Sequence, residues 1–234
     1  MLRIYIDKFG FDKSILFKNQ EFILESGKVV GIIGENGTGK STILNMICGN
    51  LNSTLKITYN DTPIIPGYND KIISISDDFI GLEYLTPIEV VQYFLLIYGK
   101  SFDKNKFDRI VNLVSIDKEV ILNEIIKNLS KGTKQKVVFI IYMMLDINII
   151  IFDEILENID KKSLCNILKE LREWVKDNSR LCLIATHSSL ILEYVDEFIC
   201  LENLGNHVDG TIITKKDKTY NGLYKVSNDK ELNY

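Results

Sequence analysis

The feature that most constrains this fold is the glycine-rich segment GENGTGKST at residues 34–42. It matches G-x-x-x-x-G-K-[ST], the pattern of the phosphate-binding P-loop. A β-branched apolar run at 28–33 precedes it and predicts a buried strand, and apolar side chains at helical spacing follow it within 41–48. Because the glycines stand where a strand turns into a helix, a chance match to the pattern is strongly disfavoured.

The residue types of this segment point to binding of a phosphorylated ligand. Glycine lets the backbone curl around an anion without a Cβ in the way, and the turn directs N–H groups inward beside the positive end of a helix. We expect Lys40 to reach the β- and γ-phosphates and Ser41 to offer its hydroxyl to Mg²⁺. The residues predicted to form this site are Gly34, Asn36, Gly37, Thr38, Gly39, Lys40, Ser41 and Thr42.

The bulk properties exclude several classes of protein. A length of 234 residues suits one well-filled α/β domain, and the net charge of −4 argues against a general nucleic-acid binder. None of the four cysteines forms a CxxC pair, so neither a zinc site nor a redox dithiol is indicated. The opening residues predict a strand and not a signal peptide, and the longest apolar stretch, 137–152, is too short and broken to span a bilayer. These properties predict a soluble, reduced, cytoplasmic protein.

Strands dominate the first third of the chain. Alternating segments at 2–6 and 21–24, together with the run into the P-loop, predict three strands. Two further strands are expected at 55–59 and 72–75, with Pro63 and Pro66 in the loop between them. Near the other end of the chain, the pair Ile212-Ile213 is interpreted as an edge strand.

Residues 84–128 change to a helical pattern. Thr86-Pro87-Ile88-Glu89 predicts a helix start, with Thr as the cap, Pro first and Glu third. Apolar residues at helical spacing continue from there, and a second helix is expected around 107–114. The sequence therefore predicts a mostly helical insert between two strand-rich parts.

Two later segments add groups suited to phosphate chemistry. Ser130 is predicted to cap a helix running to about residue 144, whose free N–H groups form a second anion site. The apolar strand 149–152 is followed by Asp153 and Glu154, at the strand end where ligands gather in α/β sheets. There Asp153 could hold Mg²⁺ through water, and Glu154 could orient and deprotonate an attacking water. The alternative, two solvated acids at a strand end, is disfavoured behind a P-loop.

His187 and two aromatic residues complete the candidate site. His187 follows the buried strand predicted at 180–186, where the phosphates are expected, so a γ-phosphate contact is favoured over a structural role. Phe9 and Phe11 lie in a predicted turn ahead of the P-loop, and stacking on a purine and ordinary packing both stay open. The basic run 215–218 is interpreted as a solvated face, and no function is read from residues 205–234.

The P-loop, the segment 129–135, the strand ending at Glu154, and His187 stand in an order that resembles the nucleotide-binding subunit of ABC transporters. The resemblance covers essentially the whole chain. The family signature Leu-Ser-Gly-Gly-x-x-Gln is matched by Leu129, Ser130, Gly132 and Gln135, while Lys131 replaces a glycine.

The resemblance implies a fold: an α/β P-loop NTPase of ABC type, with a mixed central sheet, an N-terminal antiparallel β subdomain and a helical subdomain. It divides a single domain, 1–234, into an ATPase core at 1–76 and 129–234 and a helical subdomain at 77–128. It also implies roles for individual residues. Asp153 matches the Walker B aspartate, Glu154 the catalytic glutamate and His187 the switch histidine. Asp160 matches the D-loop residue and Phe11, or else Phe9, the A-loop aromatic, while the signature residues Ser130, Gly132 and Gln135 are implied to contact the nucleotide.

The chain departs from the family pattern at several positions. Ile155 stands where proline is common, and Glu157-Asn158-Ile159 replaces Ser-Ala-Leu. Asp77, or else Asp78, stands where the family has a glutamine that serves Mg²⁺ and the membrane subunit. A carboxylate is a good ligand for a hard cation but cannot donate a hydrogen bond as an amide can. Asp77 therefore joins Ser41 and Asp153 in the predicted metal site.

By this resemblance the chain is an ATPase that hydrolyses Mg²⁺-bound ATP to power transport through a separate membrane permease, with export favoured by the signature variant and Asp77. Two cassettes would clasp two ATP molecules, each on the P-loop of one subunit and under Ser130 and Gly132 of the other. A homodimer and a heterodimer both stay open. The protein would lie on the inner face of the cell membrane, held by its permease.

The alternative function is that of a soluble ABC ATPase acting on a ribosome or nucleic acid. The chain carries one set of motifs where tandem translation factors carry two, and its insert lacks the heptads of a long coiled coil. No nucleic-acid partner is therefore expected. A plain P-loop kinase would leave the segment 129–135 without a role.

Overall fold

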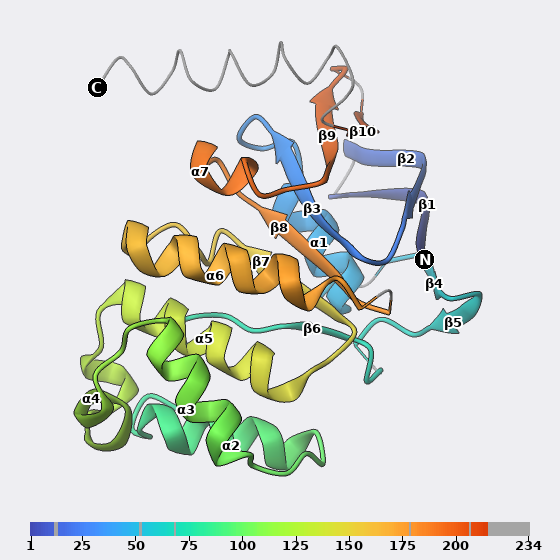
Figure 1. Cartoon of the computed structure of the whole chain (residues 1–234). Coiled ribbons are helices and arrows are strands. Elements are labelled where there is room, and N and C mark those ends of the chain that lie inside the picture. Colours follow the sequence, from blue (N-terminus) through green and yellow to red (C-terminus); the bar gives the residue numbers. More distant parts are fainter. Residues whose placement is uncertain (12–13, 52, 68, 178, 206, 215–234) are drawn as a thin grey trace.

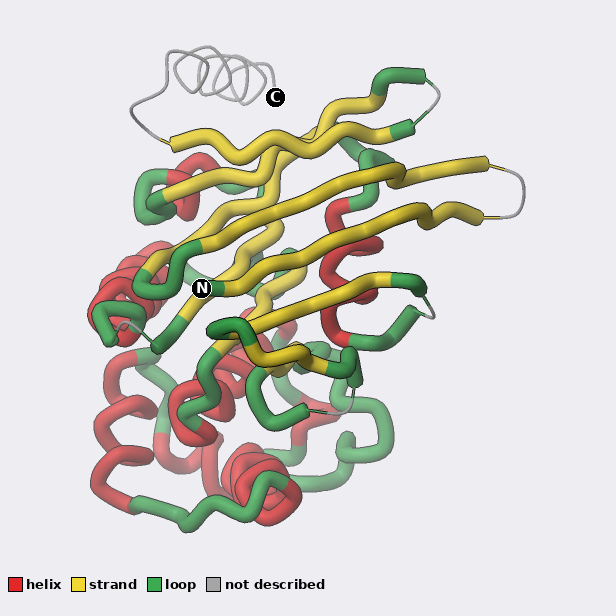
Figure 2. The backbone as a smooth tube through the Cα atoms, turned by 90° about the vertical axis from the view of Figure 1, so that its right-hand side faces the viewer, coloured by secondary structure: helices red, strands yellow, loops and turns green. Residues whose placement is uncertain are grey.

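A ten-stranded sheet runs through the protein, and the computed structural model describes it over residues 1–11, 14–51, 53–67, 69–177, 179–205 and 207–214. The strands are β1 (Leu2–Phe11), β2 (Ser14–Leu24), β3 (Lys28–Gly34), β4 (Leu55–Tyr59), β5 (Thr62–Ile64), β6 (Ile72–Ser74), β7 (Ile149–Asp153), β8 (Leu181–Ala185), β9 (Glu197–Asn203) and β10 (Val208–Thr214). Their spatial order is β5-β4-β1-β2-β10-β9-β3-β8-β7-β6. Figure 2 shows the strands together in one half and most helices in the other.

The sheet is mixed, as expected for this fold. Strands β9, β3, β8, β7 and β6 are parallel to one another, whereas β1 pairs antiparallel with both β2 and β4, and β4 with β5. Parallel strands need crossover connections, and the helices supply them. They are α1 (Lys40–Cys48), α2 (Pro87–Ile97), α3 (Lys104–Leu113), α4 (Lys118–Asn123), a 3₁₀ turn η1 (Ile126–Asn128), α5 (Lys131–Leu145), α6 (Lys161–Trp174) and α7 (Ser189–Leu192).

The parallel strands are buried on both faces, which explains their continuous apolar sequences. Along β7, Ile149 and Ile151 pack with α1 in one hydrophobic cluster, while Ile150 and Phe152 pack with α5 and α6 in the other. Both clusters follow from the two-residue period of a strand. As Figure 1 shows, α5 and α6 cover one side of these strands and α1 lies on the other. The sheet is therefore held rigidly at the point where the P-loop leaves β3.

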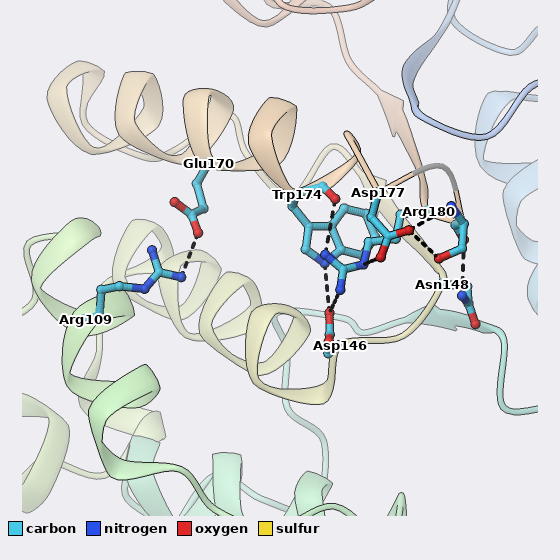
Figure 3. A network of polar contacts seen from close by, with 8 residues as sticks. Arg109, Asp146, Asn148, Glu170, Trp174, Asp177 and Arg180 are labelled. Atoms are coloured by element: carbon cyan, nitrogen blue, oxygen red, sulfur yellow. Dashed lines mark hydrogen bonds and ion pairs between the residues drawn. The ribbon is translucent and has the colours of Figure 1, made fainter.

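Helices α2, α3 and α4 form a helical insert that packs on α5. Its first helix starts as the sequence predicts, because Thr86 and Glu89 form a capping box ahead of Pro87 at the first position. An ion pair of 2.8 Å between Arg109 Nη2 of α3 and Glu170 Oε1 of α6 also joins the insert to the core (Figure 3). None of the helices in the described ranges is long and apolar enough to cross a membrane.

Three predictions about the strands are wrong in detail. Strand β10, which contains Ile212 and Ile213, is an interior strand between β2 and β9 and not an edge strand. Phe9 and Phe11 lie within β1, which continues through an irregularity at Gly10, and not in a turn. Pro63 lies inside β5, which the edge position of that strand permits. The error for β10 concerns which strands are neighbours, whereas the errors for Phe9, Phe11 and Pro63 concern how far a hairpin strand extends.

Candidate functional site

The P-loop links the carboxyl end of β3 to the start of α1, as the motif predicts. Gly37 and Gly39 have φ values of 84° and 90°, a region that side chains with a Cβ rarely adopt. A Cβ at Gly37 would meet nothing within 4 Å, whereas one at Gly39 would lie 2.9 Å from the Phe17 ring of β2. The loop is therefore open on one side and closely supported on the other.

Lys40 is held across this loop by its own backbone. Its Nζ donates to the carbonyl oxygens of Gly34 and Glu35, at 2.9 and 3.1 Å, and the side chain is only 6% exposed. Burial lowers the pKa of Lys40, and the carboxylates of Glu154, Asp153 and Glu157 act in the opposite direction. The ammonium is thus partly desolvated, and among the described residues its hydrogen bonds go to backbone carbonyl oxygens and not to a carboxylate, so an anionic ligand can take their place.

The first helical turn of α1 meets the end of β7 at this edge of the sheet. Ser41 Oγ donates to Asp153 Oδ1 at 3.0 Å. Burial raises the pKa of Asp153, and the charge of Glu154 raises it further, while the hydrogen bond from Ser41 lowers it. A hydroxyl and a carboxylate are oxygen donors of the kind that Mg²⁺ uses when water and phosphate complete its coordination. The pair therefore fits the predicted magnesium site.

Glu154 and His187 face each other beside that pair. Glu154 has φ 59°, and its N–H donates to the Ala185 carbonyl oxygen of β8 at 3.0 Å, so the neighbouring strand fixes its backbone. His187 Nε2 lies 3.7 Å from Glu154 Oε1, and both side chains are about half exposed (48% and 49%). A carboxylate and an imidazole are thus presented to solvent at the carboxyl ends of adjacent strands, where a water molecule and a γ-phosphate can reach them.

The signature segment begins α5 as predicted. Ser130 is exposed, and its Oγ accepts from Thr133 N at 3.1 Å and shares a hydrogen bond of 2.7 Å with Thr133 Oγ1. Gly132 packs so closely on the backbone that a Cβ there would clash with the Asn158 carbonyl oxygen. Among the described residues, neither Ser130 nor Thr133 has a side-chain hydrogen bond to the P-loop of the same chain.

Comparisons with known proteins agree with this geometry. The family model described as "ABC transporter" matches residues 17–157. The chain belongs to the ABC transporter family. It is 30% identical over 183 residues to the "Probable peptide export ATP-binding protein YydI" of Bacillus subtilis, covering 77% of this chain and 80% of that protein. It is 29% identical over 206 residues to the "Putative hemin import ATP-binding protein HrtA" of Staphylococcus aureus, covering 83% and 91%.

Solved structures of ABC cassettes have the same fold. An "ATP binding subunit of ABC transporter" superposes with a TM-score of 0.79 at 24% identity, covering 98% of this chain and 97% of that one. A dimeric cassette bound to ADP and Pi gives a TM-score of 0.75 at 18% identity, covering 93% and 100%. Like the relatives it matches, this chain is an ATP-binding subunit of an ABC transporter and an ATPase. The relatives support transport over the ribosome or nucleic-acid alternative.

Gln135, from the ABC signature, is bonded inside the protein at both ends of its side chain. It is fully buried, its Nε2 donates to Asp77 Oδ2 at 3.0 Å, and its Oε1 accepts from Asn158 N at 3.0 Å. Gln135 therefore joins the Asp77 loop to the segment after β7, and its nucleotide contact stays a prediction.

The same contact bears on the interpretation of Asp77. Its Oδ2 accepts a hydrogen bond from Gln135 Nε2 at 3.0 Å. One carboxylate oxygen is thus occupied inside the protein, and a metal contact by Asp77 stays a prediction. The sequence shows only that an acid replaces the family's glutamine. It could not reveal that the buried Gln135 amide would donate a hydrogen bond to that acid.

The predicted purine platform is exposed and lies at a hairpin end. Phe11 is 53% exposed, pairs with Ser14 where β1 and β2 meet, and packs edge-on against Phe9 at 5.3 Å between ring centroids. Residues 12 and 13 lie outside the described ranges. Leu16 and Phe17 of β2, which the sequence did not single out, lie within about van der Waals contact of the P-loop at Gly39.

Proposed function

We propose that this ABC ATPase hydrolyses ATP at the carboxyl edge of its parallel strands, with Glu154 as the general base and His187 as the γ-phosphate contact. The observation that carries the assignment is the position of these two side chains, 3.7 Å apart and half exposed, beside the hydrogen bond between Ser41 and Asp153. Lys40 is assigned to the β- and γ-phosphates. Ser41 and Asp153 would hold Mg²⁺, which neutralises charge on the phosphates when bound.

The contacts of the site support these roles. A base must lie within reach of the water whose proton it takes, and Glu154 is positioned by its backbone bond to Ala185 while its carboxylate stays exposed. His187 can donate Nε2–H toward an oxygen of the γ-phosphate, where charge develops during transfer. Lys40 is already held over the loop by two carbonyl oxygens, so an incoming phosphate replaces those acceptors without a large movement of the side chain.

We further propose that two cassettes clasp ATP between them. The P-loop half of the site leaves the γ-phosphate open on one side, and Ser130 presents an exposed helix start with no side-chain bond to its own P-loop in the described ranges. The N–H groups at the start of α5 can bind the phosphates of an ATP held by the other subunit. Neither half alone surrounds the γ-phosphate, so ATP would promote dimerisation and hydrolysis would release it.

Mixing two inactive variants tests this arrangement. Lys40→Ala lacks its own P-loop cation, and Ser130→Asp keeps a good helix cap while bringing a negative charge toward the phosphate. A mixed dimer would contain one site with an intact P-loop and an intact signature, so ATPase activity should return on mixing. Ser130→Asn, a neutral cap, is the matched control and should keep most of the activity.

If each site is complete within one chain, mixing will restore nothing, and the paired-subunit proposal fails. If Ser130→Asp alone hydrolyses ATP at the native rate, then the start of α5 does not meet a phosphate. Light scattering of the Glu154→Gln variant with ATP should show a dimer that disappears when ATP is removed.

We also propose that the helical insert, as a subdomain of residues 77–128, docks a separate membrane permease and holds the protein at the inner face of the membrane. Large apolar side chains are exposed here on the loop after β6 and on α2, with Ile80 at 85%, Tyr84 at 71% and Leu96 at 79%. Apolar side chains gathered on an exposed surface are typical of an interaction site, because burying them against a partner removes apolar area from water. Export is the proposed direction of transport. It is supported by the signature variant with Lys131 and by the name of the YydI relative, whereas the name of the HrtA relative refers to import.

Co-purification from detergent-solubilised membranes tests the partner. A multi-span membrane protein should accompany the native chain, and Leu96→Asp should lose it while keeping ATP binding. Recovery of ribosomes or nucleic acid in its place would overturn the transport assignment. Leu204, also exposed but after β9 and outside the insert, gives a control variant of the same type.

A further inference from the structure

Glu157 reaches from the segment after β7 to the loop that carries His187. Its Oε1 accepts from His187 N at 3.3 Å and from Thr186 Oγ1 at 3.5 Å. Thr186 is 1% exposed, and its Oγ1 in turn accepts from Ser188 N at 3.0 Å. One carboxylate thus engages the loop at the residue that is proposed to contact the γ-phosphate and at its neighbour.

The backbone that carries Glu157 is itself fixed. Leu156 and Ile159 on either side are buried, at 1% and 7% exposure. Asn158 N donates to the buried Gln135, and Asp160 pairs with Lys136 of α5 at 2.6 Å. Because α5, the signature helix, anchors this segment, the backbone at Glu157 is fixed. The Glu157 carboxylate can therefore hold the loop that carries Thr186 and His187, here called the switch loop.

Residue type explains how Glu157 can make this contact where the usual serine of the family could not. The family pattern has serine at this position, and a serine hydroxyl extends one bond beyond Cβ, whereas a glutamate carboxylate extends two bonds further. The charge of Glu157 also acts to raise the pKa of Lys40, against the larger effect of burial.

We propose that Glu157 is a positioning residue: its carboxylate, held by the signature helix through the segment 156–160, fixes the switch loop so that His187 stays opposite Glu154. The proposal rests on the roles proposed above for Glu154 and His187. Within one subunit, α5 is proposed to meet the ATP bound by the partner, and His187 is proposed to contact the ATP bound by the subunit itself. Glu157 would link these two elements directly. The link runs from Gln135 through Asn158 to Glu157.

The test compares three substitutions in the full-length protein. Glu157→Ala and Glu157→Ser remove the acceptor, and we expect kcat for ATP hydrolysis to fall by about 3- to 12-fold, which corresponds to the loss of one hydrogen bond. KM and the affinity for Mg²⁺-free ATP should stay within about twofold, because the phosphate contacts of the P-loop are untouched. Glu157→Gln keeps an acceptor oxygen and should restore kcat to within about twofold of the native value.

A double substitution separates positioning from a general loss of structure. If Glu157 acts through His187, then Glu157→Ala should have no further effect on kcat in a His187→Ala background. Glu202→Ala, an exposed glutamate on β9, is the matched control and should leave kcat unchanged. Thermal unfolding of each variant shows whether the protein is folded.

Native kcat in Glu157→Ala, a raised KM with unchanged kcat, a Glu157→Gln variant as slow as Glu157→Ala, or a full additional loss in the His187→Ala background would each overturn the proposal. Native turnover in Glu154→Gln would instead overturn the proposed catalytic roles, so the two failures are distinguishable.

Discussion

The two ends of the parallel strands carry similar side chains and use them differently. At the amino ends of β7 and β8, Asp146 Oδ1 accepts from Trp174 Nε1 at 3.2 Å and pairs with Arg180 Nη2 at 2.8 Å (Figure 3). Arg180 also donates to the Trp174 carbonyl oxygen at 3.3 Å and lies over its ring. At the carboxyl ends, Asp153 has a serine hydroxyl and Glu154 faces a histidine at 3.7 Å.

The difference shows how a ligand site can be told from a structural network. At the amino ends Asp146 has a basic partner, Arg180, inside the chain, so its charge is already balanced. At the carboxyl ends three acids and one buried lysine share one edge, and they are bonded mainly to hydroxyl and backbone groups. A cavity of about 350 Å³ lies at the amino ends, among Lys106, Arg109 and Trp174, so a hollow also accompanies a network whose charges are paired inside the chain.

The largest effect should come from the assigned base. Glu154→Gln keeps the size of the side chain but cannot take a proton, and we expect kcat to fall by about 10²- to 10⁴-fold. Binding of ATP should persist, because Lys40 and the loop N–H groups are unchanged. Steady-state phosphate release and a nucleotide titration measure the two quantities.

A carboxylate at the opposite end provides the control for this comparison. Asp146→Asn should keep turnover per folded molecule within about twofold, since that network does not reach the phosphates. Equal losses in Glu154→Gln and Asp146→Asn would mean that the comparison between the two ends is mistaken.

The next effect concerns binding rather than turnover. Lys40→Ala removes the one buried cation of the site, and a charge-assisted hydrogen bond contributes about 1.5–3 kcal/mol, so ATP affinity should fall roughly ten- to hundredfold. The free energy of unfolding should change little, because burial lowers the pKa of Lys40 and its charge is costly without a ligand. Titration with a fluorescent nucleotide measures the ATP affinity, and urea unfolding measures the free energy of unfolding. A Lys40→Ala variant with native ATP affinity would contradict the assignment of Lys40 to the phosphates.

The structural network should respond in the opposite way. Asp146→Ala removes the acceptor of Trp174 and Arg180, and we expect the free energy of unfolding to fall by about 1–2 kcal/mol, discounted because the Asp146 and Arg180 side chains are 41% and 24% exposed. Asp146 also has φ 52°, which Asn tolerates and Ala does not, so Asp146→Asn should cost less. ATP turnover should be unchanged in both, as measured beside urea unfolding. Loss of turnover without loss of stability would contradict the division.

Local patterns predicted the parts of this fold that local physics decides. The P-loop turn, the capping box at Thr86 and the cap at Ser130 each depend on a few neighbouring residues, and each is present. The position of β10 was mistaken because strand neighbours are chosen across the whole chain, whereas Pro63 was mistaken because β5 is a short strand formed by pairing with β4. The burial of Gln135 could not be predicted for a related reason, since its two partners come from segments 58 and 23 residues away in the sequence.

The smallest effect is expected for the ion pair between Asp160 and Lys136, which belongs to the segment after β7 and is already paired inside the chain. Asp160 Oδ2 is 2.6 Å from Lys136 Nζ, and its Oδ1 accepts from Ser163 N at the start of α6. The Lys136 hydrogen bond and the bond from Ser163 hold the pKa of Asp160 well below its usual range. Since a depressed folded-state pKa stabilises the protein above the unfolded value of 3.8, this contribution is lost as the pH falls through the folded-state value.

Asp160→Asn keeps the helix cap and removes only the charge, so it isolates this contribution. Because the Asp160 side chain is 55% exposed, we expect a loss of about 0.5–1 kcal/mol in the free energy of unfolding at pH 7. The difference from the native protein should narrow as the pH falls below about 4, where the unfolded carboxyl becomes protonated. Urea unfolding of both proteins across this pH range measures it. A difference that is constant with pH would mean that the charge of Asp160 contributes nothing and that its helix cap alone anchors the segment carrying Glu157.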